Sequence, residues 1–434
     1  MLSAFAQAFR TPDLRRKLLF TLGIMAIFRL GSVIPTPGVS YPNVQQCLDM
    51  VGSTNDLLGL VNLFSGGALL QLSVFALGIM PYITASIITQ LLRVVIPRFE
   101  ALQKEGQAGQ AKLTQYTRYL TIFLAVLQST TMITMARSGN LIPGCPVPLI
   151  PNDSWVTIVL MIITMTAGTG LIMWLGELIT ERGVGNGMSL LIFTSIAAGF
   201  PSALWSVGGA ANGLANVTIV IALLLVITLV VVFVEQSQRR IPVQYAKRMV
   251  GRRMYGGSST YIPLKINMAG VIPVIFASSL LALPGLFAQF GDQTEGWVQW
   301  ITLNLLSPSA PLYMAIYFLL TLFFAFFYTS ITFNPDDVAD NMKRYGGFIP
   351  GIRAGRPTAE YLQYVITRIT SAGALYLAII AIFPVIVFAA LNLPDTVGFA
   401  LGGTSILIVV GVGLQTVKEI DSQLQQRHYE GFLR

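Results

Sequence analysis

Residues 216–235 read NVTIVIALLLVITLVVVFVE, and the basic pair Arg239 and Arg240 follows shortly after. A helix needs about 20 apolar residues to cross a hydrocarbon core of about 30 Å, so this stretch predicts a transmembrane helix. Ten apolar runs of this kind lie along the chain, at 18–37, 73–93, 115–136, 154–177, 187–205, 216–235, 267–288, 311–332, 370–391 and 398–417. The sequence therefore predicts an all-α polytopic membrane protein with ten transmembrane helices.

The basic residues divide sharply between the two sides of this arrangement. If the N-terminus is cytoplasmic, the cytoplasmic stretches contain 25 of the 27 Lys and Arg residues. The external loops contain only Arg137, and Arg29 alone lies at membrane depth. Cytoplasmic loops retain Lys and Arg during insertion, so this asymmetry predicts that both termini lie in the cytoplasm.

The composition excludes a soluble protein. The mean hydropathy is +0.69, 54% of the residues are hydrophobic and only 11% are charged. A soluble chain of this length has about 25% charged residues, and without them it would aggregate. The net charge of +8 is concentrated on the cytoplasmic face. Such a face suits anionic lipids, and it would also suit RNA or an acidic protein.

The loop lengths favour two halves, 1–205 and 206–434, with five spans each. Three of the four loops in each half match in length, and the third does not. Since five is an odd number of crossings, the two halves must be inverted relative to each other. Inverted repeats commonly enclose a site or path at their interface.

Residue types that the spans lack limit the function. Between the ends of the spans there is no Asp, Glu, Lys or His, which counts against an ion-coupled transporter. The single histidine, His428, provides neither a triad nor a metal cluster, and no phosphate-binding loop is present. We therefore expect no enzyme activity, cofactor or metal. Any transport would be driven by a partner.

Two isolated features leave alternatives open. Arg29 either extends outward to the external interface or has a buried partner. Cys47 and Cys145 both fall in external loops, where an oxidising compartment could pair them. We expect two unpaired thiols, because nothing in the sequence brings those loops together.

Residues 57–72, LLGLVNLFSGGALLQL, are apolar but too short to span a membrane. They are interrupted at Ser65-Gly66-Gly67 and precede the second span. The segment is interpreted either as a short helix folded back into a cavity or as an amphipathic helix on the external surface. Interior prolines follow in the second and seventh spans, in Gly78-Ile79-Met80-Pro81 and Gly270-Val271-Ile272-Pro273, and predict kinked helices there.

Two long cytoplasmic loops, 236–266 and 333–369, predict a docking surface. The first is basic, with alternating apolar residues and a Gly256-Gly257 turn, which predicts a protruding β-hairpin. The second contains GGFIPGIR at 346–353, a rigid turn that displays Arg353. Basic and aromatic residues on a stiff projection favour RNA or protein over a lipid as the partner.

At these residues the chain resembles the SecY family, the channel subunits of the bacterial protein-conducting translocon. The resemblance covers essentially the whole chain and includes RLG at 29–31, IPTPG at 34–38, NLFSGG at 62–67, FALGIMPYI at 75–83, ITERGVGNG at 179–187 and NMAGVIP at 267–273. It implies an hourglass of two inverted, pseudo-symmetric halves with a constriction ring, a re-entrant plug helix, and a lateral gate between spans two and three and spans seven and eight.

The resemblance also implies roles for particular residues. The ring maps to Ile79, Ile83, Met188, Ile192, Ile275 and Ile408, and the plug to Asn62, Leu63, Phe64, Ser65, Gly66 and Gly67. The polar cluster of the gate maps to Thr84, Gln128 and Asn267, and the docking residues to Lys247, Arg252, Arg253 and Arg353. Two positions depart from the family: Met188 replaces a common isoleucine, and Ala354 replaces the proline that usually follows the docking arginine.

The function implied is a channel in the bacterial plasma membrane that passes unfolded secretory polypeptides and releases membrane-protein helices sideways. The implied partners are SecE and SecG, the SecA motor ATPase, the ribosome through its proteins and rRNA, signal peptides and nascent chains, and anionic lipids. The alternatives are an ion-coupled solute transporter, which the lack of intramembrane carboxylates disfavours, and a non-transporting scaffold. The plug-like segment and the polar-lined spans count against the scaffold.

Overall fold

The computed structural model describes the chain except for residues 1–8, 10, 52–64, 70, 140–146, 153, 210–212, 246–247, 251–252, 256–258, 289–295, 308, 392–399 and 432–434. The first half contains α2 (Pro12–Val33), α3 (Tyr41–Val51), α5 (Met80–Val95), α6 (Pro97–Lys104), α7 (Gln107–Ser138), α8 (Trp155–Arg182) and α9 (Gly187–Gly208). The second contains α10 (Gly213–Gln236), β1 (Gln238–Tyr245), β2 (Arg248–Val250), β3 (Arg253–Tyr255), β4 (Ser259–Lys265), α11 (Ile272–Ala288), α12 (Gly296–Ile301), the π-helix η1 (Thr302–Leu306), α13 (Pro311–Thr332), α14 (Pro335–Arg344), β5 (Gly347–Phe348), α15 (Arg356–Ala390) and α17 (Gly403–Gly431).

Each of the ten predicted spans coincides with a helix. Within the described residues, seven helices are long and apolar enough to cross a membrane, and these lie in α7, α8, α9, α10, α13, α15 and α17. The other three predicted spans fall on α2, α5 and α11, which have 22, 16 and 17 residues. The mostly helical fold is therefore confirmed, and the count of ten crossings stays a prediction.

The kinks predicted at Pro81 and Pro273 are wrong, because both prolines lie at helix starts. Each is the second residue of its helix, α5 or α11, where the missing N–H would have had no helical partner. Three residues before each proline a glycine has a positive φ, +55° at Gly78 and +63° at Gly270. A glycine turn followed by a helix start therefore occurs once in each half, and it makes both helices shorter than the predicted spans 73–93 and 267–288.

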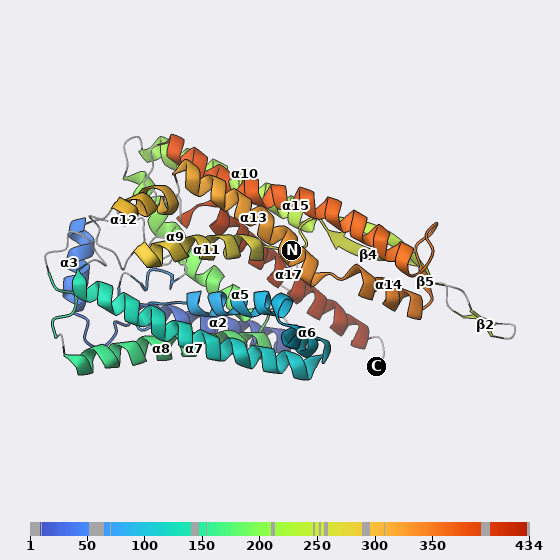
Figure 1. Ribbon diagram of the computed structural model, residues 1–434, viewed down its shortest axis with the longest axis horizontal. Helices are drawn as coiled ribbons and strands as arrows, with labels where there is room; N and C mark the ends of the chain where they lie inside the picture. The colour runs from blue at the N-terminus through green and yellow to red at the C-terminus, as the bar shows by residue number, and fades with distance from the viewer. Residues whose placement is uncertain are drawn as a thin grey trace.

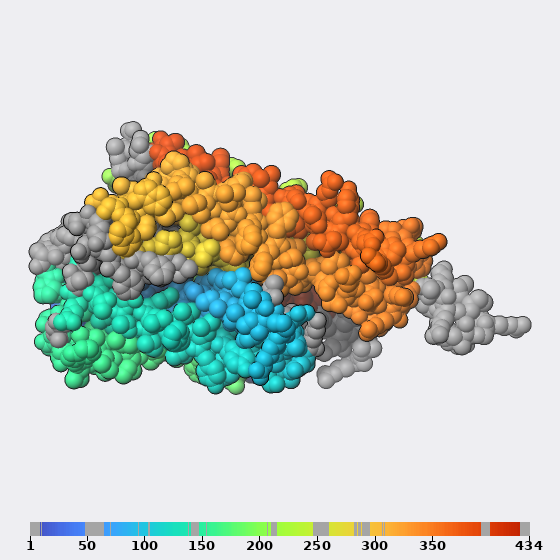
Figure 2. All heavy atoms as spheres, viewed as in Figure 1, coloured from blue at the N-terminus to red at the C-terminus, as the bar shows by residue number. Residues whose placement is uncertain are grey.

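The helices form an elongated bundle in which the two halves lie side by side. Figure 1 shows α7 and α8 along one side, α10, α13 and α15 along the other, and α11 and α17 between them. The short helices α3 and α12 lie at one end, and α14 and β5 at the opposite end. The space-filling view (Figure 2) shows the first half, in blue to green, meeting the second, in yellow to orange, along the length of the molecule.

The two long loops that were predicted to be cytoplasmic, 236–266 and 333–369, join in one small sheet, and the sequence did not predict this joining. The expected hairpin is present as β1 paired antiparallel with β4, for example Ile241 opposite Ile262. On its other edge β1 pairs with β5 of the second loop, so the strand order is β4-β1-β5. The inner face packs on α14 and α15 through a core of Ile241, Val243, Leu264, Met342, Ile349, Leu362, Val365 and Ile366.

The expectation of unpaired thiols is wrong for Cys47, which is disulfide-bonded. Cys145, the only other cysteine in the chain, lies outside the described residues. The loops are brought together by contacts that the sequence did not reveal: the Asn43 amide donates to the carbonyl of Pro148 at 2.9 Å, and Ser40 N–H donates to the carbonyl of Leu149 at 3.1 Å. Cys47 is fully buried in the same apolar cluster as Leu149.

Candidate functional site

The six ring residues lie in one apolar cluster between the two halves. They lie at or just before the starts of four helices: Ile79 immediately precedes α5 and Ile83 lies in its first turn, Met188 and Ile192 lie on α9, Ile275 on α11 and Ile408 on α17. The five isoleucines are all at most 8% exposed, and Met188 is half-buried. The space where the halves meet is therefore closed by apolar side chains contributed from both of them.

A close approach between α8 and α9 positions the side chain of Met188. A Cβ added to Gly187 would lie 1.9 Å from the carbonyl oxygen of Gly176, so the two helices touch backbone to backbone there. The thioether of Met188 lies against Gly176, where a Cβ would come within 2.5 Å of its sulfur. An unbranched methionine adapts to this narrow contact more easily than a branched isoleucine.

The plug segment is described only from Ser65 onward; Asn62, Leu63 and Phe64 lie outside the described residues. Ser65 is fully buried, and Leu69 and Leu72 are 3% and 0% exposed in the core of the first half. Thr36 N–H donates to the carbonyl of Leu72 at 3.0 Å, which ties the segment's end to the chain after α2. This part of the segment is buried, as the re-entrant interpretation requires and the surface helix does not.

Arg29 has a half-buried partner within the protein, which favours the second of the two alternatives left open for it. Its guanidinium Nη1 donates a hydrogen bond of 3.0 Å to the carbonyl oxygen of Gly66. The sequence singled out both residues, Arg29 as the lone charge at membrane depth and Gly66 within the plug, and it did not connect them.

The gate residues are not joined by hydrogen bonds among the described residues. The hydroxyl of Thr84 donates to the carbonyl of Met80 on its own helix, and the amide of Asn267 donates to Glu235 and to the carbonyl of Gly270. Gln128 is half-buried on α7. The sequence did not predict that Glu235 accepts this hydrogen bond from Asn267. A carboxylate at the end of the apolar run 216–235 was the one available sign that it has a polar partner.

The helices on either side of the predicted gate do meet. α5 contacts α11, and Ile87 of α5 packs against the apolar cluster of the second half. Helices α5 and α7 pack together on one side, and α11 and α13 on the other. Apolar contact therefore closes this seam, and the polar cluster stays a prediction.

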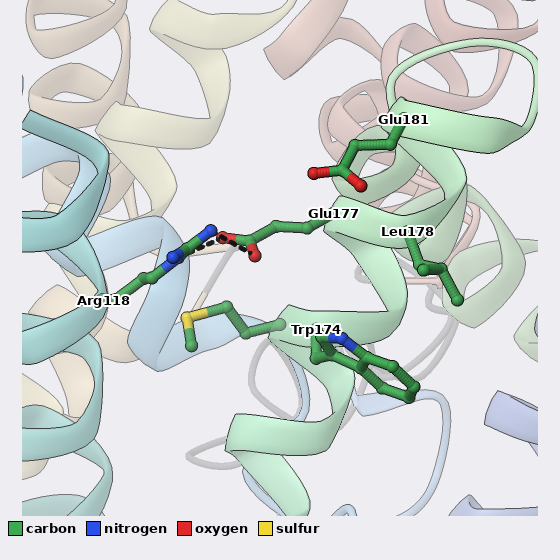
Figure 3. Close-up of a pocket in the computed structure, with 6 residues that line it drawn as sticks. Arg118, Trp174, Glu177, Leu178 and Glu181 are labelled. Atoms are coloured by element: carbon green, nitrogen blue, oxygen red, sulfur yellow. Dashed lines mark hydrogen bonds and ion pairs between the residues drawn. The ribbon is translucent and has the colours of Figure 1, made fainter. Parts of the chain in front are cut away.

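A cavity of about 380 Å³ lies between α7 and α8, apart from the ring. Its lining residues are Arg118, Met173, Trp174, Glu177, Leu178 and Glu181. Figure 3 shows Arg118 reaching across to Glu177, and the two groups form a pair of parallel hydrogen bonds of 2.8 Å each. Such forked pairs add geometric specificity, so this one fixes α7 against α8.

The docking residues are only partly described. Lys247 and Arg252 lie outside the described residues, and Arg253 begins β3, which projects at the tip of the hairpin with its partner β2. Arg353 is exposed between β5 and α15. Its carbonyl accepts a hydrogen bond of 2.8 Å from the hydroxyl of Thr358. This bond holds the turn, although the chain has Ala354 at the position where the family usually has a proline.

These features define a helical membrane protein built around an apolar cluster to which both halves contribute, with a small sheet at one end. The SecY family model matches residues 73–417, and the chain belongs to this family. It is 65% identical to the protein translocase subunit SecY of Streptomyces scabiei over 439 aligned residues, which cover 100% of both chains.

Solved structures share the fold at low sequence identity. One is a SecY whose plug domain is described as stabilising the closed state of the translocation channel and maintaining a membrane seal; its TM-score is 0.60 at 18% identity. Another is Sec61 in a canine ribosome–channel complex, with a TM-score of 0.60 at 17% identity. In each case the match covers 93% of this chain and 91% of the other.

Proposed function

We propose that this chain is the channel subunit of a bacterial protein translocon. It passes unfolded secretory polypeptides across the plasma membrane and releases membrane-protein helices sideways into the bilayer. The observation that carries the proposal is the convergence of six apolar side chains from both halves in one cluster. Membership of the SecY family supports it.

The chemistry of the ring suits a pore that accepts many sequences. An apolar constriction blocks ions by excluding water, and it needs no specific bond with what passes through it. The side chains of isoleucine and methionine can change rotamer around a peptide of any composition. The segment around Ser65 to Leu72 is the plug in this proposal, and the seam between α5 and α11 is the lateral gate.

The partners follow from the cytoplasmic platform formed by β1, β4, β5, α14 and α15. We propose that the SecA motor and the ribosome dock there, that SecE and SecG accompany the chain in the membrane, and that anionic lipids contact its basic rim. Both termini are cytoplasmic in this arrangement. Signal peptides and nascent chains are the substrates, and the motor supplies the energy because the channel is not a catalyst.

Arg353 provides a direct test of the docking surface. Arg353→Glu should lower motor-driven translocation about ten- to a hundredfold, because one or more charge-assisted contacts of about 1.5–3 kcal/mol become repulsive. The measurement is ATP-dependent import of a secretory precursor into vesicles reconstituted with the channel, its accessory subunits and the motor.

Arg356 offers a matched control. Its side chain is 90% exposed and pairs with the neighbouring Glu360 on α15, and such a surface pair contributes little to stability. Arg356→Glu should translocate nearly normally. Equal rates for Arg353→Glu and the unchanged channel would remove Arg353 from the docking surface.

An ion-coupled solute transporter remains the alternative of a different class. It needs an intramembrane group that carries a proton or holds a cation, and the sequence places no Asp, Glu, Lys or His between the ends of the spans. Uptake of a solute by vesicles containing this chain alone, driven by an ion gradient, would favour that alternative.

A further inference from the structure

Arg29 sits near the outer end of α2 and makes one hydrogen bond across to the plug. The bond joins its guanidinium to the carbonyl of Gly66, 37 residues further along the chain. Within the described part of the chain no carboxylate pairs with Arg29. A charged group at membrane depth is costly unless it is bonded or reaches water, and such groups usually have a function.

Gly66 fits this contact because it has no side chain. Its φ is +67°, a conformation that residues with a Cβ rarely adopt. A Cβ added there would lie 2.8 Å from Nη1 of Arg29 and 3.3 Å from Cα of Ser195 on α9. Gly66 is therefore held between α2 and α9, with its carbonyl turned to the guanidinium.

The neighbourhood shows why this contact can hold the segment in place. Ser65 and Ser195 are fully buried, and the hydroxyl of Ser65 accepts a hydrogen bond of 3.1 Å from Leu69 N–H. Helix α9 also supplies the ring residues Met188 and Ile192. Gly66 of the plug segment therefore lies against both Arg29 and α9, the helix that contributes two of the ring residues.

We propose that Arg29 is the latch of the closed channel: its hydrogen bond to the Gly66 carbonyl holds the plug segment against α9. The proposal rests on the proposed channel function. A bond from a charged donor to a peptide carbonyl is stronger than a neutral hydrogen bond, yet water can replace it when the segment leaves. An ion pair with a carboxylate would hold the plug more firmly.

The test compares resting ion leak and export of a precursor with a defective signal sequence. Arg29→Met keeps an unbranched chain and removes the donor, so both readouts should rise about tenfold or more, the factor expected for one hydrogen bond from a charged donor. Arg29→Lys keeps the charge and a donor, and it should restore most of the closure. The amount of channel in the membrane is measured in parallel.

Two glycine variants test the same contact at its acceptor, Gly66, and they can be used if Arg29→Met does not accumulate in the membrane. Gly66→Ala forces a Cβ against the guanidinium, whereas Gly67→Ala meets the same backbone strain, at φ +90°, with nothing within 4 Å. Gly66→Ala should leak clearly more than Gly67→Ala. Equal behaviour of the two variants would overturn the latch.

A double variant separates the latch from the plug. In a channel lacking residues 60–70, which include Gly66, Arg29→Met should add no further leak because its partner is gone. Additive effects would place the role of Arg29 elsewhere and overturn the latch. If Arg29→Met leaks no more than the unchanged channel while the channel lacking residues 60–70 does leak, the latch is wrong and the plug is kept. If the channel lacking residues 60–70 does not leak, the plug itself is wrong.

Discussion

Replacing Ile83 and Ile275 together by serine should raise the resting ion conductance of the channel by about tenfold or more. Ile83 comes from α5 and Ile275 from α11, and each is 8% exposed within the ring cluster. Burying an isoleucine side chain contributes about 1.5–3 kcal/mol, and about 1.4 kcal/mol corresponds to a factor of ten. Serine hydroxyls at both positions also hold water in the constriction, which removes the barrier to ions.

The measurement is single-channel recording in planar bilayers without a motor or substrate. The matched control is Ile163→Ser with Ile379→Ser, since these isoleucines are 59% and 49% exposed on the outer faces of α8 and α15. The control should keep the resting conductance of the unchanged channel. If the ring variant conducts no more than the control, the seal does not lie at this level.

Deleting residues 60–70 should give a channel that folds, leaks ions and exports precursors with defective signal sequences. The deletion removes the buried Ser65 and Leu69 and the carbonyl that Arg29 binds. Loss of the buried Leu69 costs about 1.5–3 kcal/mol of folding stability, which we expect a bundle of this size to tolerate. The ring keeps all of its residues, so the leak reports on the plug.

Leak and signal stringency are measured in the same strain, with membrane-inserted channel quantified. An external surface helix in place of a plug predicts that the deletion changes neither quantity. Unchanged leak together with unchanged stringency would therefore rule out the plug.

The sequence predicted the helices well because hydrocarbon imposes one strong rule. Each apolar run had to become a helix, since backbone groups in lipid must bond within their own segment. The hairpin of the loop 236–266 was also predictable, because apolar and polar residues alternate along it. Its pairing with β5 was not, because a strand of two residues, Gly347–Phe348, has no sequence signature.

The errors came from contacts between distant segments. The prolines at Pro81 and Pro273 predicted kinks, and only the structure shows that the helices begin there. The sequence showed an interruption at Ser65-Gly66-Gly67, and only the structure shows its form: Gly66 and Gly67 have φ of +67° and +90° and turn the chain. The disulfide at Cys47 was missed because the approach of residues 147–150 to α3 is a tertiary contact.

The candidate site divides in the same way. The resemblance supplied the ring residues, and their convergence required the folded structure because they come from four helices far apart in the chain. The bond between Arg29 and Gly66 depends on one side chain crossing from α2 to the plug. Asn267 stays a predicted gate residue, and its hydrogen bond to Glu235 of α10 is a contact that the sequence did not predict.

The most direct test of the central claim is to locate a polypeptide while it is being translocated. A photo-crosslinking residue is placed at Ile83 or Ile275, or at the control position Leu229, which is 69% exposed on the outer face of α10. A secretory precursor is then arrested midway by a folded domain at its end. We predict crosslinks to the arrested chain from both ring positions and none from Leu229. Crosslinks from Leu229 alone, in vesicles that translocate normally, would contradict passage between the two halves.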